Sequence, residues 1–190
     1  MSEKELIDLI QQHDPAAKKL VFESFYSRLA AISARYCKNQ TQAEEFLNAG
    51  FHNCFTKLSS ARDLHHETFS AALTREFIKE AIAFIKNIRS EYYVSSTVYA
   101  TEPQTKNYDL FHDNEKIDFR SVDDAVLLKA VQQLVPAQRL VFNLHVIEGY
   151  NLEEVAELLE ASAPTVKSNL EKARFNVQKN IEKSLKSIKP

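Results

Sequence analysis

The stretch NLEEVAELLEASAPTVKSNLEKAR (residues 151–174) decides the fold of the second half of the chain. Asn151 and Glu154 have the spacing of a capping box, in which each side chain satisfies a backbone N–H at the start of a helix. Apolar residues then recur at helical spacing until Leu159. Ser162 is placed to cap a second helix, whose first turn tolerates Pro164. A short helix, a tight turn and a longer helix predict a helix-turn-helix.

The charge of the second half is divided between its two parts. From Ala163 to Pro190 there are seven basic and two acidic residues, whereas from Asp123 to Ser162 there are two basic and seven acidic. The whole chain has a formal net charge of −2. A basic helix on an acidic support can bind DNA phosphates locally while the total charge stays near zero. The alternative is that the lysines form only a solvated face.

Helical periodicity also dominates the rest of the chain. Asp14 and Pro15 are suited to start a helix, and Pro136 is suited to start another that ends at the break around Gly149. The first half repeats apolar residues at steps of three and four, which predicts a bundle of three or four helices. Two stripes of the first half are Phe22, Phe25, Tyr26, Leu29, Ile32 and Tyr36, and then Leu47, Phe51, Cys54, Phe55 and Leu58. A similar stripe in the second half is Leu140, Val141, Leu144 and Ile147.

The helical pattern stops near Val94 and returns near Val122. Between Glu91 and Val122 there are three basic and six acidic residues without apolar periodicity, which predicts a linker. We therefore expect an all-α protein of two small helical domains joined by a flexible acidic linker. The expected bounds are 1–93, 94–121 for the linker and 122–190, with the helix-turn-helix in the last.

The composition excludes several classes of function. The chain has 190 residues but only two glycines, too few for a glycine-rich phosphate loop or a dinucleotide fingerprint. Cys37 and Cys54 are far apart and suit reduced thiols in a cytoplasmic protein. The histidines have no metal-site spacing, and no segment is apolar enough to insert into a membrane. We expect no metal, no cofactor and no catalysis by the chain itself.

Residues 134–177, LVPAQRLVFNLHVIEGYNLEEVAELLEASAPTVKSNLEKARFNV, resemble region four of bacterial sigma factors, above all the extracytoplasmic-function group. The resemblance rests on Pro136, the Glu148-Gly149-Tyr150 break, the acidic helix after it and the TVKS run from Thr165. Asn169 stands where arginine is usual and Glu160 where glycine is usual. In that family this domain contacts the upstream promoter element and the flap of the polymerase β subunit.

The first half is similar to region two of the same family. VFESFYSRLAAISARYC resembles its opening helix, and AEEFLNAGFHNCFTKL aligns with the stretch that docks on the clamp of the β′ subunit. The next segment, FSAALTREFIKEAIAFIKNIRSEYY, falls where the family melts and binds the downstream promoter element. There Ala72 occupies a usually aromatic position and Lys79 a usual asparagine.

The resemblance implies an alternative sigma factor that binds core RNA polymerase and promoter DNA, with an anti-sigma factor as a further partner. Two alternatives stay open: a sigma-like helix-turn-helix regulator, and a decoy that binds an anti-sigma factor without initiating transcription. The residues expected to contact DNA are Thr165, Lys167, Ser168, Asn169, Lys172 and Arg174, with Lys79, Lys86 and Arg89 near the downstream element. Those expected at the polymerase are Glu44, Glu45, Asn48 and Phe51.

Overall fold

The computed structural model describes residues 8–12, 14–60, 68–88 and 122–188, which form helices and contain no strand. The expected all-α class is confirmed. The chain divides into two compact units, Met1–Phe84 and Ile85–Pro190. The linker expected at 94–121 lies outside the described residues. Within the described residues, no helix is long and apolar enough to span a bilayer.

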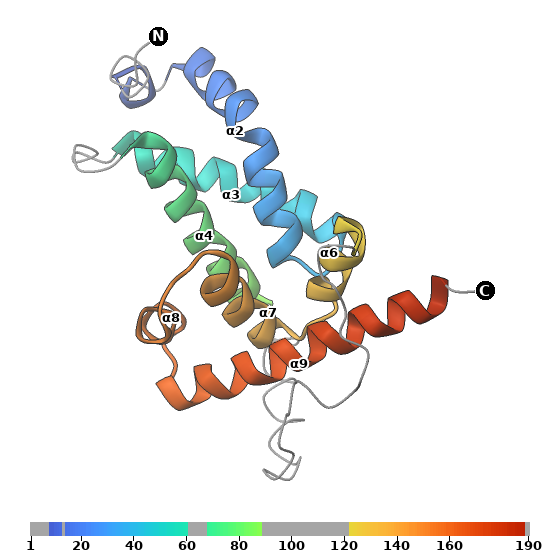
Figure 1. Ribbon diagram of the computed structural model, residues 1–190. Coiled ribbons are helices and arrows are strands. Elements are labelled where there is room, and N and C mark those ends of the chain that lie inside the picture. The colour runs from blue at the N-terminus through green and yellow to red at the C-terminus, as the bar shows by residue number, and fades with distance from the viewer. Residues whose placement is uncertain (1–7, 13, 61–67, 89–121, 189–190) are drawn as a thin grey trace. The chain divides into compact units, whose positions relative to one another are not determined.

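Three long helices build the first unit: α2 (Pro15–Tyr36), α3 (Gln40–Ser60) and α4 (Phe69–Asn87) (Figure 1). Asp14 caps α2 as expected, because its carboxylate accepts a hydrogen bond of 2.7 Å from the backbone N–H of Ala16. Gly50 lies in the middle of α3, where a Cβ atom would come within 2.7 Å of the Phe46 ring and 3.1 Å of the Phe77 ring. The missing side chain therefore lets α3 and α4 pack their aromatic residues closely.

The second unit contains α6 (Asp124–Gln132), α7 (Pro136–Phe142), the π-helical turn η3 (Asn143–Ile147), α8 (Leu152–Leu159) and α9 (Ala163–Ile188). Asp123 caps α6, and Pro136 occupies the first turn of α7 as expected. The predicted break after α7 is present, and Gly149 adopts a φ of +84° there. The π-helical turn was not anticipated.

The π-helical turn changes which apolar residues are buried. Leu140, Val141 and Leu144 lie in the core as the spacing predicts, but Ile147 is 42% exposed and Val146 is 44% exposed. A π-helical turn contains more residues than an α-helical turn, so it rotates the side chains that follow it away from the expected face. The correction for Ile147 follows from this local change of period.

Arg139 joins α6 to α7 from inside the core. It is 2% exposed, and its guanidinium Nη1 donates hydrogen bonds to the carbonyl oxygens of Gln132 (2.9 Å) and Leu134 (2.8 Å). Carbonyls at a helix C-terminus lack partners within the helix and carry its negative dipole end, so a buried cation is favourable there. Arg139 thereby fixes the angle of the turn between the two helices.

The turn between α8 and α9 depends on a strained residue. Glu160, which ends α8, adopts φ 54° and ψ 44°, and it is the only described non-glycine residue with a positive φ. The next residue closes the helix end, because the Ala161 N–H donates to the carbonyl of Ala156 at 2.9 Å. Ser162 then caps α9 as expected, since its Oγ accepts a hydrogen bond of 3.3 Å from the N–H of Thr165.

The left-handed conformation of Glu160 predicts a stabilising substitution. Glu160→Gly should raise the free energy of unfolding of the second unit by about 1 kcal/mol, because glycine adopts positive φ without a Cβ penalty. Urea unfolding followed by helical circular dichroism measures it. Glu160→Gln should leave stability nearly unchanged, which separates the backbone effect from the charge. Glu157→Gly, inside α8, should instead lower stability by about 1 kcal/mol. A destabilised Glu160→Gly would contradict this account of the turn.

The burial of Arg139 predicts a large loss of stability when it is replaced. Arg139→Met keeps much of the side-chain volume but leaves two carbonyl oxygens without their donor, so we expect unfolding to become about 2–4 kcal/mol easier. Arg174→Met is the matched control, since Arg174 is exposed, and it should change stability by less than about 0.5 kcal/mol. Equal effects of the two substitutions in the same urea experiment would show that Arg139 does not hold α6 and α7 together.

Candidate nucleic-acid interface

Capping hydrogen bonds and buried side chains fix how α8 and α9 lie against each other. The capping box predicted at the start of α8 is present: the N–H of Glu154 donates to Asn151 Oδ1 at 2.9 Å, and the N–H of Asn151 donates to Glu154 Oε2 at 2.7 Å. Val155 and Leu159 are the buried residues of α8, which packs beside α9 near its N-terminal end (Figure 1). The arrangement is that of a helix-turn-helix, in which the second helix enters the major groove of DNA.

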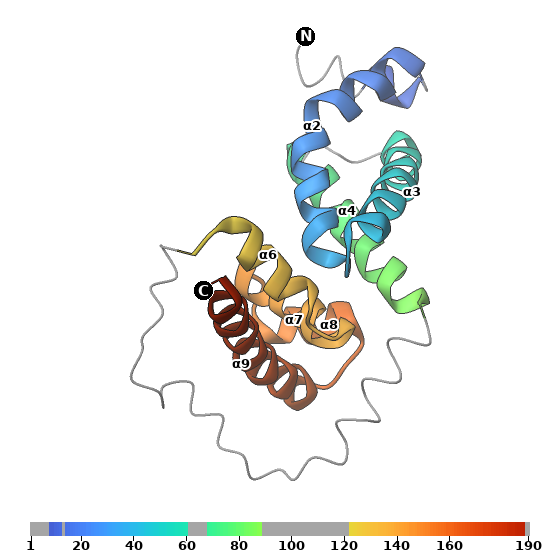
Figure 2. The same ribbon diagram turned by 90° about the vertical axis from the view of Figure 1, so that its right-hand side faces the viewer.

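The inner face of α9 is anchored along most of its length. Val166, Leu170, Ala173 and Ile181 are all at most 4% exposed. Two polar side chains add to these contacts: Asn176 Nδ2 donates to Gln138 Oε1 of α7 at 2.8 Å, and Asn180 Nδ2 donates to the carbonyl of Ala130 in α6 at 3.1 Å. Figure 2 shows α6 beside α9. This two-sided attachment fixes the rotation of α9 about its axis and therefore which residues face outward.

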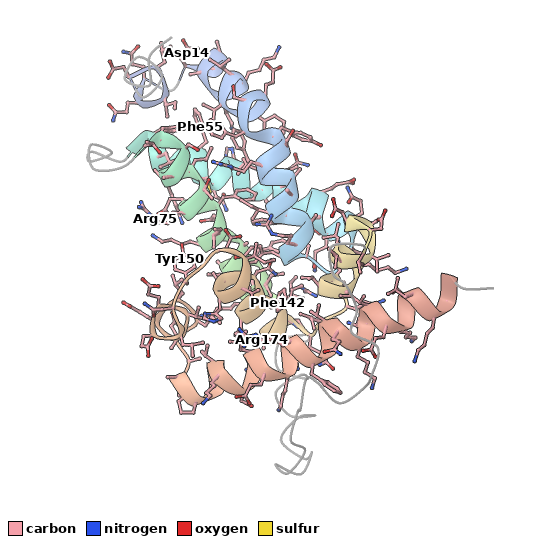
Figure 3. The ribbon with its side chains drawn as sticks, viewed as in Figure 1. Asp14, Phe55, Arg75, Phe142, Tyr150 and Arg174 are labelled. Carbon is pink, nitrogen blue, oxygen red and sulfur yellow. The ribbon has the colours of Figure 1, made fainter. Side chains whose placement is uncertain are left out.

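The residues expected to contact DNA lie on the outer side of α9. Thr165, Lys167, Ser168 and Arg174 are exposed, and Asn169 and Lys172 are partly exposed. Figure 3 labels Arg174 on α9. The first turn of α9 contains no acidic residue, so the positive end of the helix dipole is not offset there. Hydroxyl, amide and cationic groups are thus gathered on one helix end, which suits contacts to bases and phosphates.

The hydroxyl of Thr165 is held in place before any ligand binds. Its Oγ1 lies 2.8 Å from the Oγ of Ser162, the residue that caps the helix. The two hydroxyls can share one hydrogen bond in either direction, which leaves a donor or an acceptor free for a partner. The cap and the candidate contact are therefore coupled, and Ser162 acts as a positioning residue for Thr165.

The second set of residues predicted to contact DNA, which is Lys79, Lys86 and Arg89, is only partly exposed among the described residues. Lys79 is exposed on α4, but its Nζ donates to Glu76 Oε1 at 2.8 Å. Burial raises the pKa of Glu76, and the hydrogen bond and charge of Lys79, with a contribution from Arg75, outweigh it and hold the pKa below its ordinary value. The ion pair is therefore present at neutral pH and is lost only as the pH falls through that lowered pKa. Lys86 is partly exposed, and Arg89 lies outside the described residues.

Position 72, in the same segment, also differs from the family that the segment resembles, because Ala72 stands where an aromatic residue is usual. Ala72 is fully buried, so the position that usually carries an aromatic residue points into the core of the first unit. Phe84, a later aromatic residue of α4, is partly buried with its ring centroid 5.2 Å from that of Phe46. A ring held against another ring in this way stabilises helix packing rather than stacking on a base.

The four residues expected at the polymerase are divided by burial. Glu44, Glu45 and Asn48 are exposed on α3, whereas Phe51 is 5% exposed, with its ring centroid 4.9 Å from that of Phe22 of α2. The burial of Phe51 agrees with its place in the predicted apolar stripe, because its ring belongs to the contact between α2 and α3, so it lies beneath the exposed residues and not among them.

A metal or thiol site would depend on the described histidine, cysteine and carboxylate side chains outside this surface. Among the described residues no three His, Cys, Asp or Glu side chains gather as a metal ion would require. Cys37 and Cys54 are both buried free thiols. Burial, followed by the nearby carboxylates of Glu80 and Glu76, raises the pKa of the Cys54 thiol to about 12. That thiol stays protonated at neutral pH and is a poor nucleophile.

Comparison with known proteins finds one family match over part of the chain and a similar solved structure. A family model described as "Sigma-70, region 4" matches residues 124–174, the range that runs from the start of α6 to Arg174. No curated protein matches the chain in sequence. Among solved structures, the sigma factor RpoE of Bartonella quintana, determined in complex with the anti-sigma factor NepR, matches with a TM-score of 0.52 at 18% identity. The match covers 86% of this chain and 96% of that one.

The likeness to RpoE shows a shared fold, and the family match covers the helix-turn-helix together with the two helices that support it. The matched residues include the TVKS run and the break at Gly149, which carry the resemblance seen in the sequence. Residues 124–174 thus match region 4 of the sigma-70 family, and the all-α chain that carries them shares the fold of a solved sigma factor.

Proposed function

We propose that the chain is an alternative sigma factor that binds core RNA polymerase and directs it to a dedicated class of promoters. The observation that carries this proposal is the anchored α9, whose outer N-terminal turns present hydroxyl, amide and basic groups within the residues matched by the region 4 family. The chain catalyses no reaction itself in this proposal, since polymerase supplies the chemistry. It acts in the cytoplasm, where polymerase and promoter DNA are found.

The DNA contact follows from the order of residues along α9. In a helix-turn-helix the N-terminal residues of the second helix contact base edges, whereas cations at its sides neutralise phosphates. Thr165 and Ser168, with the amide of Asn169, supply the groups for base edges of the upstream promoter element. The cations that supply phosphate contacts are Lys167, Lys172 and Arg174.

The polymerase contacts are divided between the two units. We assign Glu44, Glu45 and Asn48 on α3 to the clamp of the β′ subunit, because they are exposed together on one helix. The buried ring of Phe51 packs beneath these three exposed residues. The second unit is assigned to the flap of the β subunit, in keeping with the region 4 match. Lys79, Lys86 and Arg89 are assigned to the downstream promoter element.

A second candidate function is favoured by the first unit. Ala72 is buried, and Lys79 is engaged by Glu76, so the described part of this segment offers little aromatic or free cationic surface for separated DNA strands. Stacking of an aromatic residue on a base contributes about 1–3 kcal/mol per base. A chain without it could serve as a sigma-like DNA-binding regulator, or as a decoy for an anti-sigma factor.

An anti-sigma factor is a further proposed partner. RpoE, whose fold the chain shares, was determined in complex with the anti-sigma factor NepR. A specificity factor that is always available competes with the housekeeping factor for polymerase, so a protein that sequesters it supplies the control. The proposal names the class of partner and not the individual protein.

The experiment that tests the function combines the purified chain with core RNA polymerase from the organism that encodes it. Run-off transcription of fragmented genomic DNA should yield discrete transcripts that require the chain. Binding to core without transcripts would contradict the sigma-factor proposal. Binding to DNA without binding to core would also contradict it and would favour the regulator. Binding to an anti-sigma factor alone would favour the decoy.

The outer face of α9 predicts the effect of removing two cations. Lys167→Gln/Lys172→Gln should lower the affinity for promoter DNA in the polymerase complex about tenfold or more, since each phosphate contact is a charge-assisted hydrogen bond. Fluorescence anisotropy with a labelled promoter fragment measures it. Lys19→Gln/Lys38→Gln removes the same charge from exposed positions of the first unit and should leave affinity within about twofold. Equal losses in the two double variants would show that only net charge matters.

A further inference from the structure

The outer face of α9 continues beyond the family match as a basic stripe. We define the distal stripe as Lys179, Lys183 and Lys186, which lie after Arg174, where the match ends. All three are exposed. At 100° per residue they point in nearly the same direction as Ser168 and Lys172. The distal stripe is therefore a continuation, along the same helix face, of the surface proposed to contact the promoter.

The carboxylates of the described residues leave the distal stripe unneutralised. No ion pair joins any of its three lysines to a described acidic residue. Glu182, the one acidic residue in this part of α9, accepts a hydrogen bond of 3.0 Å from Gln178 Nε2 instead. The ammonium of Lys179 lies 6.0 Å from the centroid of the Phe175 ring on the preceding turn, a contact that holds the cation at the outer face.

The opposite face shows that this part of α9 is fixed. Ile181 is fully buried in a cluster with Val122 and Ala130, and Val126, Leu127, Val177 and Leu185 pack against it. Asn180 adds its hydrogen bond to the carbonyl of Ala130. The later turns of α9 are thus held by α6, so the lysines project from a rigid support rather than from a free helix end.

The length of α9 determines where the distal stripe lies when the first turns occupy a groove. From Ser168 to Lys186 the helix rises about 27 Å, at about 1.5 Å per residue. The major groove is about 12 Å wide and winds around the duplex, so a straight helix leaves it within a few turns. The later turns must cross the sugar-phosphate backbone at the groove edge. Lysines at that point meet phosphates and not bases.

From this continuity, length and charge we infer that the distal stripe is a second DNA-binding surface, which contacts the phosphate backbone beside the promoter element without regard to sequence. The inference rests on the proposed function for its placement of the first turns of α9 in the groove. The occupant is duplex DNA, because a row of cations that form no ion pair with the described carboxylates, on a helix held by α6, complements a row of phosphates. Its role is to add affinity and not specificity.

The test measures the salt dependence of DNA binding by the full chain. A labelled duplex of random sequence is titrated at several KCl concentrations, and the logarithm of the association constant is plotted against the logarithm of salt. Lys179→Gln/Lys183→Gln/Lys186→Gln should reduce the slope by about 2.7, since each lost phosphate contact reduces it by about 0.9. The control, Lys19→Gln/Lys38→Gln/Lys129→Gln, removes three exposed lysines elsewhere and should keep the wild-type slope. Circular dichroism confirms that both variants are folded.

Two results would overturn the inference. Equal slopes for wild type and the distal variant would show that these lysines do not meet DNA. Unchanged DNA binding together with loss of core polymerase in co-elution would show that the stripe binds an acidic protein surface instead. Run-off transcription by the wild-type chain separates this inference from the proposed function. Absent transcripts with a reduced slope in the distal variant would leave the DNA surface standing and remove the sigma-factor role.

Discussion

The second unit depends on one buried cation. Arg139 donates to the last carbonyls of α6 and the turn after it, so the end of one helix is satisfied by a side chain from the next. An ion in a protein core is costly unless hydrogen bonds compensate for the lost water. That requirement favours an angle between α6 and α7 that brings both carbonyls to the guanidinium. The hydrogen bonds donated by Asn176 and Asn180 of α9 are accepted by residues of these two helices.

The orientation of the outer face of α9 follows from the support that α6 and α7 give to its inner face. Because Asn176 and Asn180 reach Gln138 and the backbone of α6, α9 is oriented from its inner side, and its outer side needs no structural role. Polar and basic residues can gather there without a cost to the core. The strained backbone at Glu160 sets the start of α9 relative to α8, and it is tolerated because the surrounding contacts determine that conformation.

Local rules account for what could be predicted from the sequence. Asp14, Pro136, the Asn151–Glu154 box and Ser162 act through neighbouring backbone atoms, so their effects are visible in a few residues of sequence. The pairing of Lys79 with Glu76 and the exposure of Ile147 were not predictable in this way. The first depends on the rotamer chosen within α4, and the second on a change of helical period at η3. The burial of Arg139 depends on the approach of the α6 carbonyls, which no local pattern of residues indicates.

The measurement that tests the central claim most directly is site-specific photo-cross-linking in the assembled complex of the chain, core RNA polymerase and a promoter fragment. A photoreactive residue at Ser168 should cross-link to upstream promoter DNA at one position of the sequence, because that side chain faces outward on the first turns of α9. The same group at Glu153, exposed on α8, serves as the comparison. Cross-links from Ser168 to protein alone, or to DNA at random positions, would contradict the account that α9 reads a promoter.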